Sequence, residues 1–297
     1  MVLAGMGKGL TRWPPPTPPG PRDDNDPMPE RIGYQGESGA YSDEACRSLF
    51  PGRDAVGHPT FAGAFGAVLA GQVQAAVLPV ENSRAGVVQE VSDLLWQHSG
   101  LGVVAEHVMA IRHQLLSRGG APVTRAWSHP QALAQCADWL NAHGIVPVPF
   151  PDTAGAARHV ATSGVAGDGA IASARAAELY GLVVVAQNVA DEPSNQTRFV
   201  VVTRTKGVAT VPSGPAKVTM GFVVKHRPGG LVSVLQLFST LGLNLSRLDS
   251  RPIPDQPFRY RFYADVELED GAQAPDLLRQ LKEVSEELRP FGVYPRA

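Results

Sequence analysis

The chain has 297 residues, of which 43% are hydrophobic and 18% charged, a balance that supports a large core and excludes a wholly disordered protein. Its formal net charge is -2, with no long basic block, which argues against a nucleic-acid-binding protein. The longest apolar runs, such as LVVVA at 182–186, are far too short to cross a membrane. We therefore expect a globular protein of about two domains that has neither nucleic acid nor a membrane as a partner.

Residues 1–29 differ in composition from everything that follows them. This segment is dense in proline and glycine and has no periodic apolar pattern. Glycine, lysine and proline interrupt any apolar stretch that could act as the core of a signal peptide. The composition predicts a disordered leader, and we expect residues 1–28 to be dispensable.

From Glu30 onward, segments typical of strands alternate with segments typical of helices. The alternation predicts parallel sheets covered by helices on both faces. In such sheets, ligands bind beyond the carboxyl ends of the strands, where helix N-termini converge. The expected strands are 31–36, 75–80, 100–111, 126–128, 147–150, 169–173 and 197–204, and the expected helices are 42–50, 87–99, 130–144, 152–164 and 174–182.

The junctions between these strands and helices carry hydroxyl and amide side chains. Each junction taken alone is typical of a helix N-cap. Together with SNQTR at 194–198, they indicate a shared cleft for an anion, because helix N-termini offer unpaired N–H groups and positive dipole ends. Neither GxGxxG after a strand nor GxxxxGK[ST] occurs, so a small organic acid is favoured over a nucleotide. The junctions are Gly36–Gly39, Glu81–Ser83, Ser128–His129, Asp152–Thr153 and Ser173–Ala174.

The two cysteines, Cys46 and Cys136, both lie in expected helices and are far apart in sequence. This spacing predicts neither a disulfide framework nor a zinc site. We interpret both as small buried hydrophobic residues, which fits a reducing cytoplasm.

The pattern changes after the proline- and glycine-containing segment 211–216. The order becomes strand 217–226, helix 231–242, strand 243–253, strand 258–269, helix 274–288 and strand 291–295. This is the β-α-β-β-α-β order of a split βαβ module. The segment contains no acid, base or metal-ligand constellation, which indicates a binding or association module.

Five stretches of the chain carry a family resemblance. GYQGESGAYSDEA, LPVENSRAGVVQEVSDLL, SHPQALAQC, IASARAAELYGL and SNQTRF, in this order, resemble the prephenate dehydratase family, and residues 217 onward resemble its ACT regulatory domain. The resemblance implies an α/β fold: a two-lobed catalytic domain at 30–205, like type II periplasmic binding proteins, and a ferredoxin-like βαββαβ ACT domain at 217–297. It places the lobes at about 30–107 plus 191–205, and 108–190, with a linker at 206–216.

The resemblance also implies an activity, the loss of water and carbon dioxide from prephenate to give phenylpyruvate in phenylalanine biosynthesis. It implies no cofactor and no metal. The motifs suit arogenate dehydratase equally, so the choice between prephenate and arogenate stays open. A small-acid binding or sensing module that catalyses nothing is the rival from another class, because fold does not determine function.

Within this resemblance, Thr197 is the expected catalytic residue, with its hydroxyl hydrogen-bonded to the departing ring oxygen. Arg198 would hold a carboxylate or point to solvent, and His129 would cap a helix or contact substrate. Glu81 would be a general acid or, as we favour, a structural partner of a base, and Asp191 would stabilise a loop. The expected substrate-binding residues are Ser38, Asn82, Ser83, Ser128, His129, Gln131, Ser173, Asn195, Arg198 and Phe199.

The ACT domain is expected to bind L-phenylalanine as an effector. The family more usually has alanine where Gly230 stands and glutamate where Asp249 stands. We also expect a homo-oligomer, a dimer or tetramer, because the strand at 258–269 is expected to be an edge strand and would pair with another chain unless something covers it. The expected effector-binding residues are Gly229, Gly230, Leu231, Val232, Asp249, Ser250, Arg251 and Pro252.

Overall fold

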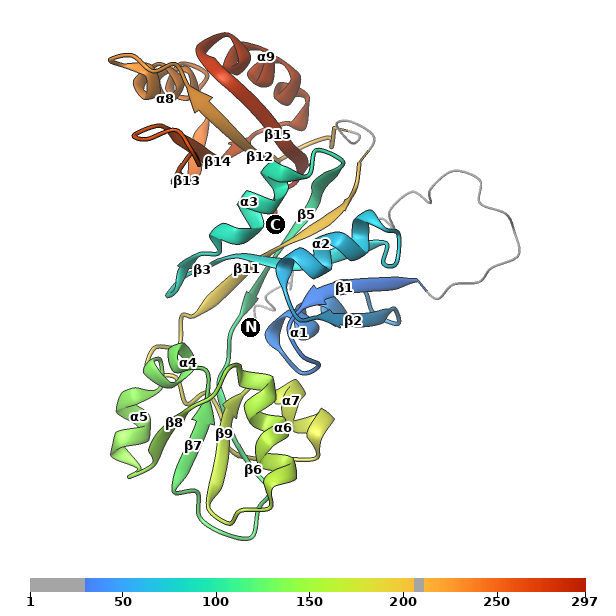
Figure 1. The fold of residues 1–297 in the computed structure, drawn as a ribbon, viewed down its shortest axis with the longest axis vertical. Helices are drawn as coiled ribbons and strands as arrows, with labels where there is room; N and C mark the ends of the chain where they lie inside the picture. The colour runs from blue at the N-terminus through green and yellow to red at the C-terminus, as the bar shows by residue number, and fades with distance from the viewer. Residues whose placement is uncertain (1–29, 206–210) are drawn as a thin grey trace, which may run out of the picture.

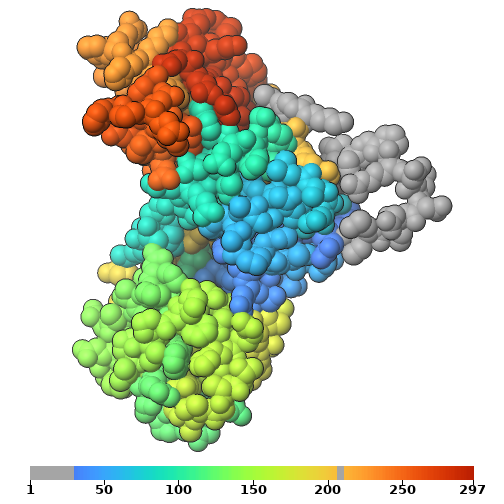
Figure 2. Space-filling view, viewed as in Figure 1, coloured from blue at the N-terminus to red at the C-terminus, as the bar shows by residue number. Residues whose placement is uncertain are grey.

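The computed structural model describes residues 30–205 and 211–297. The expected leader and residues 206–210 of the expected linker lie outside these ranges. Three bodies follow one another along the long axis of the molecule, and the blue-to-cyan body lies between the other two (Figures 1 and 2). Across residues 30–205 and 211–297, every helix is too short or too polar to cross a membrane.

The central body, here called the first lobe, is built on a mixed sheet. Helix α1 (Tyr41–Leu49) covers one face of this sheet, and α2 (Phe61–Leu69) and α3 (Gln89–Gln97) cover the other. Each face therefore has its own apolar core. The strand order is β2 (Asp54–His58), β1 (Arg31–Gln35), β3 (Ala75–Asn82), β11 (Gln196–Arg204) and β5 (Leu101–Ala110), with β4 (Gly86–Val87) paired to β3.

The second lobe repeats this arrangement on a smaller scale. Helices α4 (Pro130–Ala134) and α5 (Ala137–Ala142) contribute to one core cluster, and α6 (Thr153–Ser163) and α7 (Ala174–Tyr180) contribute to another. The expected coverage of both faces is thus confirmed in both lobes. The strand order is β10 (Val183–Ala186), β6 (Gln114–Ser117), β9 (Asp168–Ala172), β7 (Arg125–Ser128) and β8 (Val146–Pro149).

The expectation of purely parallel sheets is wrong, because β11 runs antiparallel to both of its neighbours. In the second lobe, β6 likewise runs antiparallel to β9 and β10. Because β11 is antiparallel to β3, the SNQTR segment at the beginning of β11 lies beside the end of β3. Thr197 therefore stands opposite Asn82 at the carboxyl end of β3.

The C-terminal body has the expected β-α-β-β-α-β order, with an antiparallel sheet in the order β13-β14-β12-β15. The expectation of an edge strand at 258–269 is wrong, because this strand is β14 and pairs with β13 on one side and β12 on the other. The helix expected over 274–288 ends at Val284, because residues from Ser285 are extended and pair with β12. Its elements are β12 (Ala216–Val224), α8 (Gly230–Thr240), β13 (Asn244–Pro252), β14 (Tyr260–Leu268), a 3-10 turn at Gly271–Gln273, α9 (Ala274–Val284) and β15 (Ser285–Pro295).

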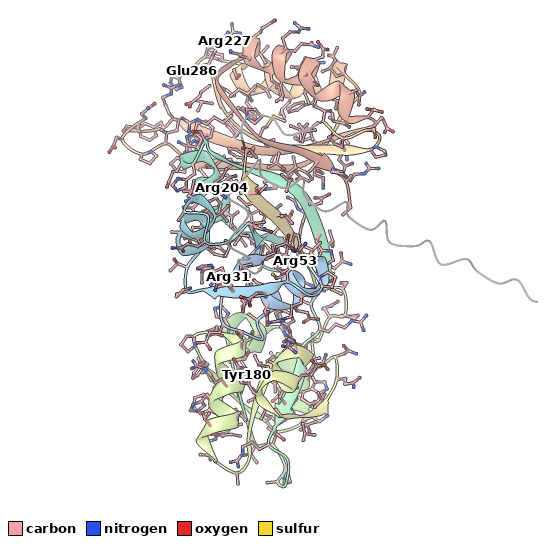
Figure 3. The ribbon with its side chains drawn as sticks, turned by 90° about the vertical axis from the view of Figure 1, so that its right-hand side faces the viewer. Arg31, Arg53, Tyr180, Arg204, Arg227 and Glu286 are labelled. Atoms are coloured by element: carbon pink, nitrogen blue, oxygen red, sulfur yellow. The ribbon has the colours of Figure 1, made fainter. Side chains whose placement is uncertain are left out.

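Both faces of this C-terminal sheet are buried. Val218 and Phe222 face α8 and α9, whereas Tyr263 and Phe291 on the opposite face join the core of the first lobe around Trp96. The sheet rests on α3 and β5 of the first lobe, and Arg227 and Glu286 lie at its far end (Figures 1 and 3). The first lobe and the C-terminal body thus share one continuous apolar core.

Candidate active site

A cavity of about 280 Å³ lies between the two lobes. Its wall combines the ends of β3 and β11 from the first lobe with α4 and the start of α6 from the second. Three of the five expected strand–helix junctions line this cavity, through Asn82, His129 and Asp152–Thr153, whereas the junctions at Gly36–Gly39 and Ser173–Ala174 do not. The lining residues are Tyr41, Ser42, Pro79, Asn82, Ala85, Val88, Ile111, His113, His129, Gln131, Ala132, Gln135, Asp152, Thr153, Asn195, Thr197 and Phe199.

The orientation of the Asn82 amide is fixed by the backbone. Its Oδ1 accepts hydrogen bonds from the N–H groups of Arg84 (3.0 Å) and Ala85 (2.8 Å). Its Nδ2 must therefore be the donor, and it donates to Thr197 Oγ1 and to Asn195 Oδ1, both at 2.8 Å. Thr197 is 7% exposed, and this is the hydrogen bond that its hydroxyl makes within the described residues. Because the Thr197 oxygen accepts from Asn82, its own proton can be donated into the cavity.

The hydrogen-bond network continues from Asn195 to Gln135 and His113. Asn195 Nδ2 donates to Gln135 Oε1 at 2.9 Å, and His113 Nε2 lies 2.9 Å from the same oxygen. A carbonyl oxygen can only accept, so His113 carries a proton on Nε2. The network therefore joins both lobes, since Asn82 and Asn195 border the first lobe and Gln135 follows α4 of the second.

The far end of the network is buried. Burial lowers the pKa of His113, against the opposing effect of its hydrogen bond to Gln135, so the imidazole is neutral at neutral pH. Its Nδ1 is then an acceptor, and the Tyr41 hydroxyl, 2.7 Å away, donates to it. Burial also raises the pKa of Tyr41 well above its ordinary value. Neutral groups from Tyr41 to Thr197 thus hold each other in one orientation.

Four of the serines expected to contact substrate do not line this cavity. Ser173 Oγ donates to the Gly39 carbonyl (2.7 Å), and the Ser38 carbonyl accepts from Tyr180 (2.7 Å), so both residues join the two lobes. Ser128 is buried and donates to the Ile171 carbonyl within the second lobe at 2.6 Å. Ser83 Oγ bonds backbone groups of Ser194 and Gln196.

Arg198 also lies away from the cavity. It alternates with Thr197 along β11, and its guanidinium contacts the carboxylates of Glu106 (3.2 Å) and Asp265 on the side of the C-terminal body. Glu81 lies 3.6 Å from Arg198 Nε, which is the structural role favoured for it above. Burial alone would lower the pKa of Arg198, but the nearby Asp265, Tyr294 and Glu106 raise it above its ordinary value.

Six of the expected substrate and catalytic residues do lie around the cavity: Asn82, His129, Gln131, Asn195, Thr197 and Phe199. His129 also caps α4, since its Nδ1 accepts from the Gln131 N–H at 3.2 Å. Asp191 accepts from the N–H groups of Asp138 and Trp139, which is the expected loop-stabilising role.

Sequence reasoning missed three cavity residues, Tyr41, His113 and Gln135, whereas the Asp152–Thr153 junction lines the cavity as expected. For Gln135 a signal existed, because it stands four residues after Gln131 in SHPQALAQC and so shares a helix face with it. For Tyr41 and His113 no local pattern exists, since their contact joins residues 72 positions apart.

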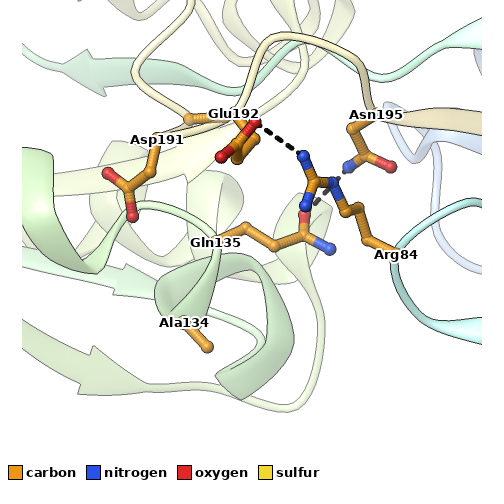
Figure 4. Close-up of a pocket in the computed structure, with 7 residues that line it drawn as sticks. Arg84, Ala134, Gln135, Asp191, Glu192 and Asn195 are labelled. Carbon is orange, nitrogen blue, oxygen red and sulfur yellow. Dashed lines mark hydrogen bonds and ion pairs between the residues drawn. The ribbon is translucent and has the colours of Figure 1, made fainter.

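A second cavity of about 210 Å³ adjoins the first and is lined by Arg84, Gln135, Asp191, Glu192 and Asn195 among others (Figure 4). Arg84 and Glu192 face each other across it in an ion pair of 2.9 Å. Asn195 and Gln135 line both cavities.

The residues expected to bind an effector fall into two groups in the C-terminal body. Gly229 has a left-handed backbone (φ 78°) before α8, and Val232 is 64% exposed. On β13, the side chain of Arg251 points towards the first lobe, where it donates to Asp93 at 2.7 Å. A methyl group added at Gly230 would lie 2.4 Å from the Lys225 carbonyl oxygen, so this backbone requires glycine where the family usually has alanine.

Comparisons with known proteins agree with this architecture. The family model described as prephenate dehydratase matches residues 32–207, and the ACT domain model matches residues 218–286. Arogenate dehydratase 2 of Petunia hybrida is 38% identical over 283 residues, covering 89% of this chain and 71% of the relative. A bifunctional N-acyl-homoserine lactone acylase/prephenate dehydratase of Komagataeibacter europaeus is 39% identical over 270 residues, covering 89% and 95% of the two chains.

A solved structure of prephenate dehydratase from Arthrobacter aurescens, in complex with L-Phe, shares the fold. It superposes with a TM-score of 0.80 at 29% identity and covers 90% of each chain. The expected two-lobed α/β fold with a C-terminal βαββαβ domain is thereby confirmed.

Proposed function

The chain belongs to the prephenate dehydratase family and is a dehydratase with a C-terminal ACT domain; from this premise we propose that it converts prephenate to phenylpyruvate, with Thr197 as the catalytic hydroxyl. One observation carries the proposal. Asn82 donates to the Thr197 oxygen at 2.8 Å, which leaves the Thr197 proton to point into the interlobe cavity.

The reaction breaks two bonds of the substrate ring. The ring carboxylate leaves as carbon dioxide, and the electron pair of its C–C bond enters the ring. The C–O bond of the ring hydroxyl breaks, and the oxygen departs with that bond's electron pair and one added proton as water. The ring becomes aromatic, so no oxidant, reductant or covalent intermediate is needed.

Thr197 acts on the departing oxygen by donating its hydroxyl proton in a hydrogen bond. Such a preorganised donor stabilises the charge that develops as the C–O bond breaks. Threonine is a weak acid at neutral pH, so the hydroxyl orients and relays a proton instead of serving as its ultimate source. Asn82 fixes the direction of the donor, and the chain through Asn195, Gln135 and His113 holds Asn82 in place.

A second candidate substrate is arogenate, the amino-acid form of prephenate. Among the Asp, Glu, Lys and Arg residues of the described cavity wall, Asp152 alone contributes to the lining. Its Oδ1 accepts from the Gly155 N–H at 2.6 Å and caps α6, and its charge lies at the cavity. A carboxylate there favours a substrate that carries an ammonium group over one that carries only carboxylates.

The test is a substrate comparison on the full chain. Release of phenylpyruvate from prephenate and of phenylalanine from arogenate would be measured at matched concentrations. A higher kcat/KM for prephenate supports the first substrate, and the reverse supports arogenate. Turnover of neither substrate overturns the proposal. An N-acyl-homoserine lactone serves as a third substrate, because one relative carries that activity in its name.

The ACT domain supports a regulatory role for L-phenylalanine in this chain. We infer that phenylalanine binds near residues 229–232 and 249–252 and inhibits the dehydratase, which would close a feedback loop. The A. aurescens structure, solved in complex with L-Phe, supports this inference. We further propose a dimer or tetramer in the cytoplasm, to be checked by light scattering at micromolar protein, where a monomer would contradict the assembly.

A further inference from the structure

Both candidate substrates carry carboxylates, but the cavity that holds Thr197 offers them no basic side chain. Among the described residues that line it, none is a lysine or an arginine, and Asp152 adds a negative charge. Moving a carboxylate out of water without a compensating partner is costly. The adjoining cavity of about 210 Å³ does contain a cation, the guanidinium of Arg84. Because Asn195 and Gln135 line both cavities, this cation lies next to the space that the substrate would occupy.

Arg84 stands on the turn that also fixes the Asn82 amide. Its backbone N–H donates to Asn82 Oδ1 at 3.0 Å, and Asn82 Nδ2 donates to both Thr197 Oγ1 and Asn195 Oδ1 at 2.8 Å. The residue that bears the cation is therefore held by the same amide that orients the proposed catalytic hydroxyl. The Arg84 guanidinium and the Asn195 amide line the second cavity together (Figure 4).

The carboxylate partner of this guanidinium is only weakly held. Arg84 Nη2 lies 2.9 Å from Glu192 Oε2 and 3.5 Å from Ser194 Oγ. The side chains of Arg84 and Glu192 are 37% and 65% exposed, and an ion pair this exposed contributes little to stability. The other carboxylate of the cavity, Asp191, accepts from two backbone N–H groups at the start of α5 and so has donors of its own. A ligand can therefore separate Arg84 from Glu192 at little cost.

We propose that Arg84 and Glu192 together recognise the side chain of the substrate. The inference rests on the proposed dehydratase function. In prephenate and in arogenate, the ring hydroxyl and the side chain are attached at opposite ends of the ring. A substrate whose ring hydroxyl is held at Thr197 therefore extends its side chain away from that residue and towards the second cavity. There Arg84 exchanges Glu192 for the side-chain carboxylate, in a planar contact to which a guanidinium is suited.

Glu192 then discriminates between the two substrates. Arogenate carries an ammonium group next to its side-chain carboxylate, where prephenate carries a keto group. The Glu192 carboxylate attracts the ammonium group once Arg84 has turned to the substrate. The keto group gains nothing from Glu192, which only competes with the prephenate carboxylate for Arg84. Glu192 is thus a specificity-determining residue that favours arogenate, in the same sense as the charge of Asp152 in the other cavity.

The experiment measures kcat and KM for both substrates in the full chain with Arg84→Met and with Glu192→Gln. Arg84→Met should raise KM for both by about 10- to 150-fold, the range of a hydrogen bond to a charged group. Its kcat should hardly change, because the contact is made equally in the ground state and the transition state. Glu192→Gln should lower KM for prephenate and raise it for arogenate, by about 2- to 5-fold for so exposed a carboxylate. A substrate that is not turned over is measured as a competitive inhibitor of the other.

Arg158→Met is the matched control. Arg158 is an exposed arginine that pairs with Glu37 at 2.7 Å, and it does not belong to the described lining of either cavity. It should leave KM for both substrates as in wild type. An unchanged KM in Arg84→Met would overturn the inference, as would an equal rise in Arg158→Met. A change of the same sign for both substrates in Glu192→Gln would also overturn it.

Calorimetry with phenylpyruvate separates this inference from the proposed function. Phenylpyruvate keeps the keto-acid side chain, so Arg84→Met should weaken its binding by the same factor as KM, and Glu192→Gln should strengthen it. These results without turnover of either substrate would overturn the dehydratase assignment alone. A wild type that does not bind phenylpyruvate, or binding that does not depend on Arg84, would overturn the recognition of the side chain.

Discussion

The first lobe has two neighbours, and it meets them in different ways. Towards the second lobe it presents a polar cavity and single hydrogen bonds, such as those from Ser173 to Gly39 and from Tyr180 to Ser38. Towards the ACT domain it presents the apolar surface around Trp96 and the buried ion pairs that Glu106 makes with Lys217 and Arg198. The first interface is built to admit a ligand, whereas the second is packed like the interior of a single domain.

Strand β11 takes part in both interfaces because its side chains alternate. Thr197 and Phe199 face the cavity, whereas Arg198 faces the ACT domain. The Thr197 hydroxyl, which we propose to be catalytic, therefore stands on a strand whose other face is held by buried ion pairs and apolar contacts. The ACT domain thus helps to fix the position of Thr197, in addition to any effector role.

The largest effect is expected from Glu106→Gln, which breaks the buried ion pairs of Glu106. Glu106 is the carboxylate within reach of Lys217, whose side chain is 9% exposed. Removing one partner of a buried pair leaves an uncompensated charge and typically costs about 3–5 kcal/mol. Urea unfolding should show a loss of this size. The exposed pair Arg31–Asp54 supplies the control, and Asp54→Asn should cost less than about 1 kcal/mol.

The proposed role of the Thr197 hydroxyl in the cavity between the two lobes is tested with Thr197→Val. Valine keeps the branched shape and the strand preference, so the melting temperature should not change. Losing one preorganised donor at developing charge typically lowers kcat by about 10²–10³-fold. Steady-state kinetics should show this fall with a smaller change in KM. Thr203→Val, at the far end of β11, should be nearly silent; a variant at 197 that keeps more than about a tenth of kcat would move the role elsewhere.

The order of the elements and two residues of the cavity could be predicted from the sequence, because their signals are local. The alternation of strands and helices and the β-α-β-β-α-β order come from runs of neighbouring residues, and both are found in the structure. Asn82 and Thr197 stand in short motifs at strand ends, and both line the cavity.

The remaining features depend on contacts between distant segments. The pairing of Tyr41 with His113 and that of Arg198 with Asp265 join residues 72 and 67 positions apart. The direction of β11 also could not be predicted, since a strand reads the same whether its neighbours are parallel or antiparallel. Ser128 and Ser173 were expected to bind substrate because they stand at strand ends. Their hydroxyls donate to backbone carbonyls instead, a use that the local sequence does not distinguish from substrate binding.

The tight packing between the first lobe and the ACT domain is tested with Gly292→Ala. A methyl group at this position of β15 would lie 2.0 Å from the Val103 carbonyl oxygen on β5, so the two strands would have to separate. Such overpacking typically costs about 1–3 kcal/mol. Gly66, inside α2, has open space around it, and Gly66→Ala should stabilise the protein slightly. Equal thermal stability of the two variants would contradict the tight interface.

The cavity network should make stability sensitive to acid through His113. Burial lowers the pKa of His113 in the folded protein, so the unfolded chain takes up a proton first as the pH falls. The stabilisation is present above the ordinary histidine pKa of about 6.5 and is lost as the pH falls towards the lower folded value, by up to about 1.4 kcal/mol per pH unit. Burial lowers the pKa of His58 and His107 as well. His113→Gln should therefore reduce the acid slope without abolishing it.

The smallest effect is expected for labelling of the two cysteine thiols. Because one thiol lies in each lobe, the stability of the two lobes can be compared in the same molecule. Cys46 packs in the core of the first lobe and Cys136 in that of the second, both are buried, and burial raises the pKa of each to about 12. A thiol reagent should therefore barely react with the native protein at neutral pH, because the thiolate is the nucleophile. In mild urea, labelling reports local opening of each core. Cys46 lies under the sheet whose other face packs against the ACT domain, so we expect Cys136 to be labelled before Cys46. Labelling of both at one rate would mean that the lobes open together and that the ACT domain gives the first lobe no extra protection.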